Sequence, residues 1–377
     1  MIYMDNAASS PLRPEVLETM LPYMRSVGNP SSIHRDGRSA RRGVEGARRH
    51  VAALLNADPS EILFTSGGTE ANNTALRGVS GGRLVTTSIE HESVLEPCRA
   101  QGARPVTYLE PDSTGTIPPE TLDESLSEPA ALVSIMTANN EVGTIQDVRA
   151  LAGVCRRHGA VFHTDMVQAA GKIPVDVKSW GVDMASVSAH KIGGPMGVGA
   201  LYVRSGTEME PLVLGGGQES GMRSGTENVA GIVGFGEACR LARAEMSRNI
   251  PYVSSLRDQL VSRLLEIPHS GLNGHPTSRL PGNAHLAFLG VNGEDLIIKL
   301  DENGIAASTG SACSVHTQKE SHVLRAMNLP AETISSSLRL TLGPQNTSEE
   351  VGKVAEAMPH IVSELRAVSP LRERYGF

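Results

Sequence analysis

The strongest constraint on the fold is the regular alternation of short apolar runs with amphipathic helical stretches along the first half of the chain. Strand-like runs occupy residues 61–65, 84–88, 105–109, 131–137, 160–164 and 183–188. Helical periodicity separates most of them, for example over 148–157. Because strands that alternate with helices need crossover connections, the pattern predicts an α/β fold with a mostly parallel central sheet. The run at 200–203 closely follows a Gly-rich turn and is expected to be an antiparallel member.

The pattern changes near residue 250, which predicts two domains. Helical periodicity dominates residues 226–266 and is interrupted near Pro251. A smaller α/β pattern follows, with strands near 284–289, 305–308 and 338–342 and helices near 294–302, 321–327 and 349–368. We therefore expect a large domain over residues 1–250 and a small C-terminal domain over 251–377. Residues 1–14 are expected to pack on the small domain.

Composition excludes several classes of protein. The 377 residues include 34 Lys and Arg against 41 Asp and Glu, a formal charge of −7, so direct contact with nucleic acid is not expected. An arginine-rich run from Arg35 to Arg49 is interpreted as a solvated helix face. No apolar run approaches the roughly 18 residues that would cross a membrane, and no signal peptide is expected at the N-terminus.

The four cysteines, Cys98, Cys155, Cys239 and Cys313, lie far apart and form no C-x-x-C pair. Neither a metal site nor a dense disulfide framework is therefore expected, and a reducing, cytoplasmic setting fits best.

Three segments at predicted strand ends carry residues suited to chemistry. The glycines of residues 65–70 follow a strand and open a helix, which is either a simple turn or a cradle whose N–H groups face a phosphate. Asp165 follows the strand at 160–164 and is either a helix N-cap or a carboxylate that pairs with a cation. Lys191 ends the next strand and is either a surface lysine or a desolvated, nucleophilic amine.

The three segments together describe a site for pyridoxal phosphate. The cradle would hold the phosphate, the carboxylate would keep the pyridine nitrogen protonated, and the lysine would form the covalent bond to the cofactor.

Motifs through nearly the whole chain extend this interpretation. They lie in order at residues 3–8, 28–32, 64–70, 90–91, 138–143, 163–165, 168, 188–191, 221–226, 308–313 and 337–339, and include FTSGGTE, NNEVG, SAHK and STGSAC. In these motifs the sequence resembles the cysteine desulfurases of the NifS/IscS type, which have the class V aminotransferase fold of pyridoxal-phosphate enzymes. A selenocysteine lyase or an aminotransferase of the same fold is the alternative enzyme, and a scaffold with a vestigial site is the non-enzymatic one.

The resemblance implies a role for each matched residue. Lys191 carries pyridoxal phosphate, Asp165 pairs with its pyridine nitrogen, and Gln168 contacts its phenolic oxygen. His91 stacks on the ring and moves protons. By the same resemblance, Gly68, Thr69, Ser188 and His190 hold the phosphate, and Thr226 reaches the phosphate of the other subunit of a homodimer. Asn140 and Arg339 hold the carboxylate of L-cysteine, and Asn140 also contacts the cofactor.

Cys313 distinguishes a desulfurase from its relatives. A single cysteine is most often a small buried apolar group, but residues 310–320 form a polar stretch without apolar periodicity. His316 and Lys319 could lower the pKa of the thiol from about 8.5. By resemblance, Cys313 accepts the sulfur of L-cysteine as a persulfide, and alanine leaves. An acceptor protein then receives the sulfur, which is destined for iron–sulfur clusters, tRNA thiolation, a sulfur cofactor or phosphorothioated DNA. The other three cysteines are interpreted as structural.

Overall fold

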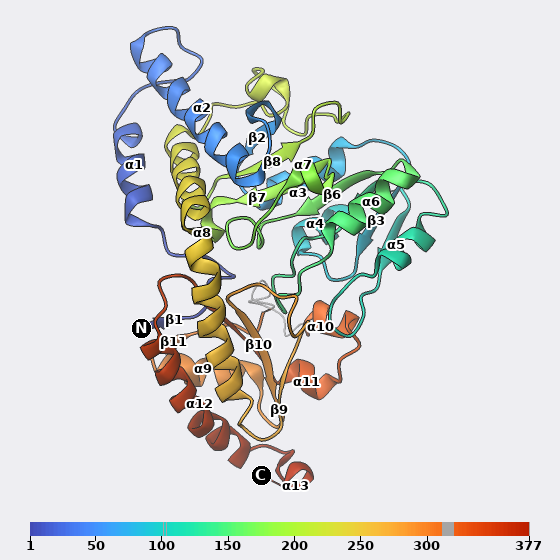
Figure 1. Ribbon diagram of the computed structural model, residues 1–377, viewed down its shortest axis with the longest axis vertical. Coiled ribbons are helices and arrows are strands. Elements are labelled where there is room, and N and C mark those ends of the chain that lie inside the picture. Colours follow the sequence, from blue (N-terminus) through green and yellow to red (C-terminus); the bar gives the residue numbers. More distant parts are fainter. Residues whose placement is uncertain (101, 103, 311–319, 377) are drawn as a thin grey trace.

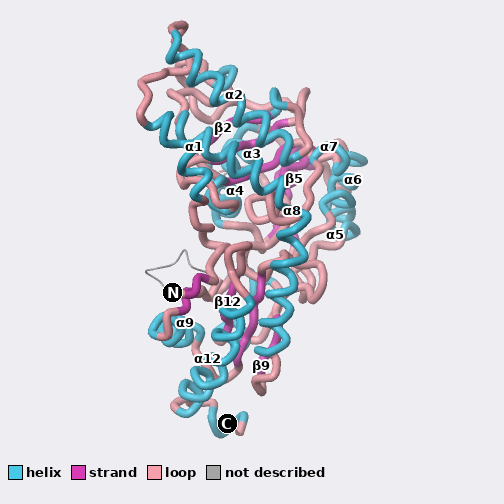
Figure 2. The backbone as a smooth tube through the Cα atoms, turned by 60° about the vertical axis from the view of Figure 1, so that its left-hand side comes forward, coloured by secondary structure: helices cyan, strands magenta, loops and turns pink. Residues whose placement is uncertain are grey.

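The computed structural model describes residues 1–377 except 101, 103, 311–319 and 377. The described chain forms two lobes stacked along the long axis of the molecule, and one long helix, α8 (Val229–Leu264), runs through both (Figure 1). A second view shows the same helix continuing from the upper lobe into the lower one (Figure 2).

The upper lobe contains a seven-stranded sheet in the order β2-β8-β7-β6-β5-β3-β4. The strands are β2 (Ile62–Thr65), β3 (Arg83–Thr87), β4 (Val106–Leu109), β5 (Ala130–Ser134), β6 (Val161–Asp165), β7 (Met184–Ser188) and β8 (Gly199–Val203). From β4 to β7 all neighbours are parallel, whereas β8 is antiparallel to both β7 and β2. The predicted α/β fold and the antiparallel strand at 200–203 are confirmed.

Helices cover both faces of this sheet, and alternate side chains of each strand face the two layers. Leu132 of β5 packs with α3 (Gly68–Gly78) and α4 (Glu92–Arg99), whereas its neighbour Val133 packs with the opposite layer. That opposite layer includes α2 (Arg35–Leu55), α5 (Pro119–Ser125), α6 (Val148–His158), α7 (Val177–Trp180) and α8. Burial on both faces explains why the strands appear in the sequence as continuous apolar runs.

The lower lobe is built on the antiparallel sheet β12 (Ser337–Thr341), β10 (Asn283–Phe288) and β9 (Ser270–Leu272). Its helices are α9 (Gly293–Glu302), α10 (His322–Ala326), α11 (Ala331–Ser335), α12 (Ser348–Ala367) and α13 (Arg372–Tyr375). The N-terminal strand β1 (Ile2–Tyr3) pairs with β11 (Ile305–Ala306), and Met4 is buried in the core of this lobe. The chain then crosses to α1 (Pro14–Met24), which packs on α8 in the upper lobe.

The predicted interruption near Pro251 is wrong, because α8 continues through this residue. A proline inside a helix costs about 3 kcal/mol. Pro251 is exposed, however, and α8 is held on both sides of it: Phe235 and Cys239 lie in the upper core, and Leu256 and Leu260 in the lower core. Packing at both ends therefore overrides the local preference.

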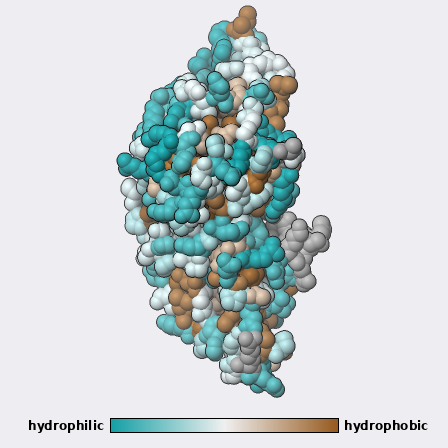
Figure 3. Space-filling view, turned by 90° about the vertical axis from the view of Figure 1, so that its right-hand side faces the viewer, coloured by the Kyte–Doolittle hydropathy of each residue, from teal (hydrophilic) through white to brown (hydrophobic). Residues whose placement is uncertain are grey.

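No described helix is long and apolar enough to cross a membrane. On the face shown in Figure 3, hydrophilic side chains predominate, and hydrophobic ones form small separate patches.

Candidate active site

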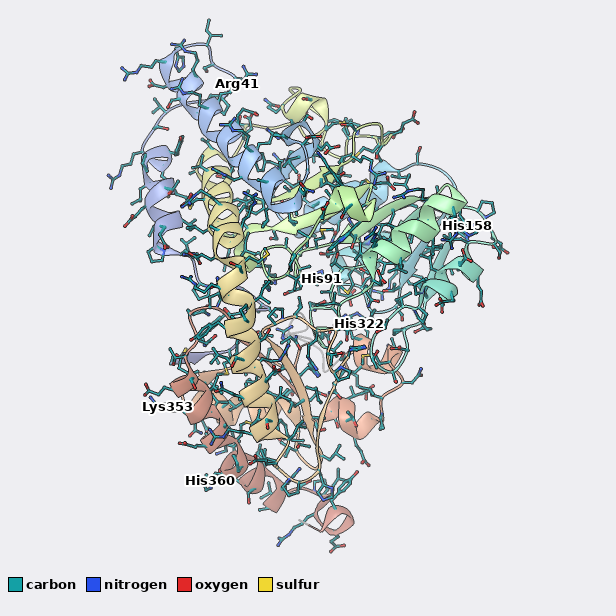
Figure 4. All side chains as sticks on the ribbon, viewed as in Figure 1. Arg41, His91, His158, His322, Lys353 and His360 are labelled. Carbon is teal, nitrogen blue, oxygen red and sulfur yellow. The ribbon has the colours of Figure 1, made fainter. Side chains whose placement is uncertain are left out.

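The candidate site lies at the carboxyl ends of β6 and β7, on the side of the large sheet that faces the lower lobe. Asp165 is the last residue of β6, Ser188 is the last residue of β7, and the 3-10 turn η2 (Ala189–Lys191) follows. Figure 4 shows His91 and His322 between the two lobes, and the Nε2 of His322 donates a hydrogen bond to the backbone oxygen of Glu90 at 2.9 Å.

The N-terminus of α3 closes against these strand ends, and only a glycine at position 68 permits the approach. A Cβ on Gly68 would lie 2.7 Å from Cγ2 of Val167 and 3.7 Å from Cβ of Ser188. Thr69 follows on the first turn and is exposed. A helix N-terminus presents unpaired N–H groups and positive potential, so this cradle suits a phosphate.

The Asp165 carboxylate is held in one orientation. The backbone N–H of Val167 donates to its Oδ1 at 2.8 Å, and Nδ2 of Asn72 donates to its Oδ2 at 2.8 Å. The chain after Asp165 forms a turn and not a helix, so the alternative role as a helix N-cap is wrong. A buried carboxylate with fixed donors is suited to pair with a protonated ring nitrogen.

Lys191 reaches the N-terminal segment that crosses between the lobes. Its Nζ donates to the backbone oxygens of Ala7 at 2.6 Å and of Ala8 at 2.8 Å. Nε2 of Gln168 donates to the same Ala7 oxygen at 2.9 Å. The side chains of Lys191 and Gln168 therefore meet at the backbone oxygen of Ala7.

A second lysine, which sequence reasoning missed, joins this group. Nζ of Lys172 donates to Oε1 of Gln168 at 2.9 Å. Burial lowers the pKa of Lys172 to about 7, with further contributions from the charges of Lys191 and Arg339. The sequence signal that could have identified Lys172 was its position four residues after Gln168, in the segment that follows Asp165.

Two histidines flank the site. His91 is half-buried at the N-cap of α4, and burial lowers its pKa although the charge of Asp165 acts against the shift. Burial and the charges of Lys191 and Lys172 lower the pKa of His190 to about 4, so its imidazole is neutral at pH 7. Nδ1 of His190 lies 3.3 Å from the hydroxyl of Ser9.

Arg339 of β12 brings the lower lobe into the site. Its guanidinium is 3% exposed, and Nη2 donates to Oδ1 of Asp5 at 2.9 Å. Nη1 donates to the backbone oxygen of Asn140 at 2.9 Å and reaches that of Gly310 at 3.4 Å. Its Nε is buried without a hydrogen-bond partner in the described structure. An unsatisfied buried cationic donor is costly, and a ligand carboxylate would offset this cost.

Cys313 lies outside the described residues. The described residues before and after it contact the surroundings of Arg339. The backbone oxygen of Gly310 lies 3.4 Å from Nη1 of Arg339. The hydroxyl of Ser321 donates to Oε2 of Glu141 at 2.5 Å. The other cysteines are buried and free, and burial raises the pKa of Cys98 and of Cys155 to about 12. Their predicted structural role fits this burial.

Thr226 is exposed in the loop between the 3-10 turn η3 (Glu219–Gly221) and α8. Within the described chain, no hydrogen bond joins it to the other predicted site residues. The described residues also contain no group of three or more His, Cys, Asp and Glu side chains that could hold a metal ion.

The geometry fits pyridoxal phosphate by the chemistry of its groups: a helix N-terminus for the phosphate, the buried Asp165 carboxylate for the ring nitrogen and the half-buried Lys191 amine for the covalent bond. Comparison with known proteins agrees. The family described as aminotransferase class-V matches residues 2–354, and the chain belongs to this family. It is accordingly a pyridoxal-phosphate-dependent enzyme.

A cysteine desulfurase IscS from Methanosarcina thermophila is 47% identical over 380 residues, which span 98% of this chain and 94% of that one. A solved structure of a NifS-like protein superposes with a TM-score of 0.91 at 38% identity and covers 97% of this chain and 100% of the other. A structure described as SspA in complex with cysteine has a TM-score of 0.81 at 34% identity, covering 92% of this chain and all of that chain.

Proposed function

We propose that the protein is a cysteine desulfurase that converts L-cysteine to L-alanine and transfers the sulfur to Cys313. One observation carries the proposal: Lys191 of the upper lobe and Arg339 of the lower lobe both contact residues 5–8, in a chain that is 47% identical to a cysteine desulfurase. The Asp165 carboxylate, oriented by Asn72, supports it. A structural relative described in complex with cysteine supports the substrate.

The described residues would hold the cofactor in a defined way. The phosphate would lie at the N-terminus of α3, among Gly68, Thr69, Ser188 and His190, with Thr226 contributed by a second copy of the chain. Asp165 would pair with the ring nitrogen, Gln168 would use its second Nε2 hydrogen toward the phenolic oxygen, and His91 would pack on the ring. When bound, pyridoxal phosphate supplies an electron sink for bond breaking next to the ring.

Different side chains would bind the substrate, move its proton and accept its sulfur. Arg339 would exchange part of its contacts for the carboxylate of L-cysteine, with Asn140 beside it, and so orient the substrate. Lys191 would leave the carbonyls of Ala7 and Ala8 and take the Cα proton at Nζ. The thiolate of Cys313 would attack the substrate sulfur, so that an S–S bond forms as the C–S bond breaks. Protons then complete alanine at Cα and Cβ, and the sulfur remains on Cys313 as a persulfide.

The wider setting is proposed on the same basis. The exposed Thr226 supports a homodimer with a shared site. A protein acceptor would receive the sulfur, for iron–sulfur clusters or for another thiolation pathway. The free thiols of the three described cysteines support a reducing cytoplasm, and the two separate cores support domains 1–250 and 251–377 joined within α8.

The test follows sulfur and alanine together. With L-cysteine, the wild type should form alanine and a persulfide on Cys313 detectable by mass spectrometry. Cys313→Ser should bind the cofactor but form no persulfide, and the matched variant Cys98→Ala should behave as wild type because its thiol is buried. Alanine formed at the wild-type rate by Cys313→Ser, or a persulfide on another cysteine, would refute the assignment. Turnover of L-selenocysteine alone would favour a selenocysteine lyase.

A further inference from the structure

We propose that Asn72 and Ser93 are positioning residues that fix one tautomer of His91, with the ring proton on Nε2. The same pair joins His91 to the Asp165 carboxylate. The catalytic consequence rests on the proposed function, whereas the hydrogen-bond argument rests on the described side chains alone. Three elements meet in this network: α3 supplies Asn72, α4 supplies Ser93, and β6 supplies Asp165.

Chemistry fixes the orientation of the Asn72 amide. An ionised carboxylate only accepts hydrogen bonds, so the amide atom 2.8 Å from Oδ2 of Asp165 must be the NH2 group. The second hydrogen of this group is directed to Oγ of Ser93, also at 2.8 Å. Asn72 is fully buried and Ser93 is 7% exposed, so water does not compete freely for these bonds.

The orientation of Asn72 then determines that of Ser93. Because its Oγ accepts from Asn72, the single hydroxyl hydrogen is free to donate elsewhere, and Nδ1 of His91 lies 2.7 Å away. The backbone N–H of Ser93 donates to the same Nδ1 at 3.1 Å. A proton on Nδ1 would face this N–H directly. Nδ1 is therefore the acceptor, and the neutral ring carries its proton on Nε2.

The network also opposes protonation of His91. An imidazolium would need a proton on Nδ1 and would lose both bonds from Ser93, and the positive potential at the N-terminus of α4 acts in the same direction. The charged or titratable groups facing the ring are Asp165, Glu92, Lys191 and His322, and burial lowers the pKa of His91 despite the two carboxylates. His91 thus enters the reaction as a neutral hydrogen-bond donor at Nε2, and Lys191 remains the base.

The experiment measures the tautomer directly by nitrogen NMR of the full-length protein labelled with 15N-histidine, with and without pyridoxal phosphate. His91→Gln identifies the His91 signals by their loss. We expect Nδ1 of His91 to resonate as an unprotonated nitrogen and Nε2 as a protonated one. In Ser93→Ala the pKa of His91 should rise by up to about one unit, the size of one neutral hydrogen bond, and Ser93→Thr should restore the wild-type value.

Ser134→Ala is the matched control. The Ser134 hydroxyl lies 2.8 Å from Nδ1 of His163 in the core of the same sheet, so this variant removes an equivalent buried Ser–His bond. It should leave the His91 signals unchanged. A protonated Nδ1 in the wild type, or an unchanged His91 pKa in folded Ser93→Ala, would overturn the proposal. Failure of the wild type to form alanine would instead overturn the proposed function, because the tautomer is read without substrate.

Discussion

Glu90 provides a sharp test of the electrostatics beneath the site. Its side chain is fully buried directly before His91, and burial raises its pKa to about 8. Oε1 accepts hydrogen bonds from the hydroxyl of Thr87 at 2.9 Å and from the backbone N–H of Met136 at 2.8 Å. Among the described residues Oε2 has no partner. Two donors lower the pKa and the Asp165 charge raises it, but desolvation dominates, so Glu90 is mainly protonated at pH 7.

The magnitude follows from proton linkage. Between pH 4.5 and about 8 the folded protein holds a proton on Glu90 that the unfolded chain has released. Stability therefore falls as the pH rises through this window, by about 1.4 kcal/mol per unit, and the contribution of Glu90 is constant above it. Over the whole window the loss is about 5 kcal/mol, and by pH 7 about 3 kcal/mol has been lost.

Glu90→Gln removes this titration while keeping the shape of the side chain. The buried amide hydrogens add a penalty of about 1–3 kcal/mol, but that penalty does not depend on pH. The free energy of unfolding of the variant should thus rise relative to wild type by about 1.4 kcal/mol for each pH unit between 5 and 8.

Urea denaturation of the cofactor-free protein, followed by circular dichroism at several pH values, measures this difference. Glu128→Gln is the control, because Glu128 is exposed. A difference between Glu90→Gln and wild type that stays constant with pH would refute the reasoning, since Glu90 would then titrate alike in both states.

Three further substitutions test the site and its supports. Gly68→Ala should weaken binding of pyridoxal phosphate by about 1–3 kcal/mol in a titration of the cofactor-free protein, because its Cβ would meet Val167 at 2.7 Å. Arg48→Met should lower the free energy of unfolding by about 3 kcal/mol in urea, because it leaves the Glu219 carboxylate, 4% exposed, without its partner at 2.7 Å. Arg339→Lys should raise the KM for L-cysteine about tenfold or more in steady-state assays, because an ammonium cannot clamp a carboxylate with two N–H groups.

Local sequence patterns were sufficient to predict the strands, but they could not predict contacts between residues far apart in the chain. Leu132 and Val133 of β5 are adjacent apolar residues buried on opposite faces, and such runs are recognisable wherever a sheet is covered on both sides. The interpretation of the arginine-rich run as a solvated face is wrong for Arg48, whose side chain is only 12% exposed. Its partner Glu219 lies 171 positions later, and periodicity within a helix contains no information about a residue that distant.

The residues of the candidate site also fall into those that local sequence patterns reveal and those that depend on long-range contacts. Lys191 and Asp165 could be found because polar residues at the ends of buried strands need a reason to be there. Asn72 and Ser93 could not be found, because polar residues in the first two turns of helices have ordinary roles. One signal was nevertheless present: Asn72 lies four positions after Gly68, and residues four apart share a helix face. Gly68, the first residue of α3, lies against the ends of β6 and β7. Asn72 lies on the same face of the helix one turn later and therefore points to Asp165. The helix proposed to hold the phosphate at its N-terminus thus also orients, one turn further on, the carboxylate proposed for the ring nitrogen.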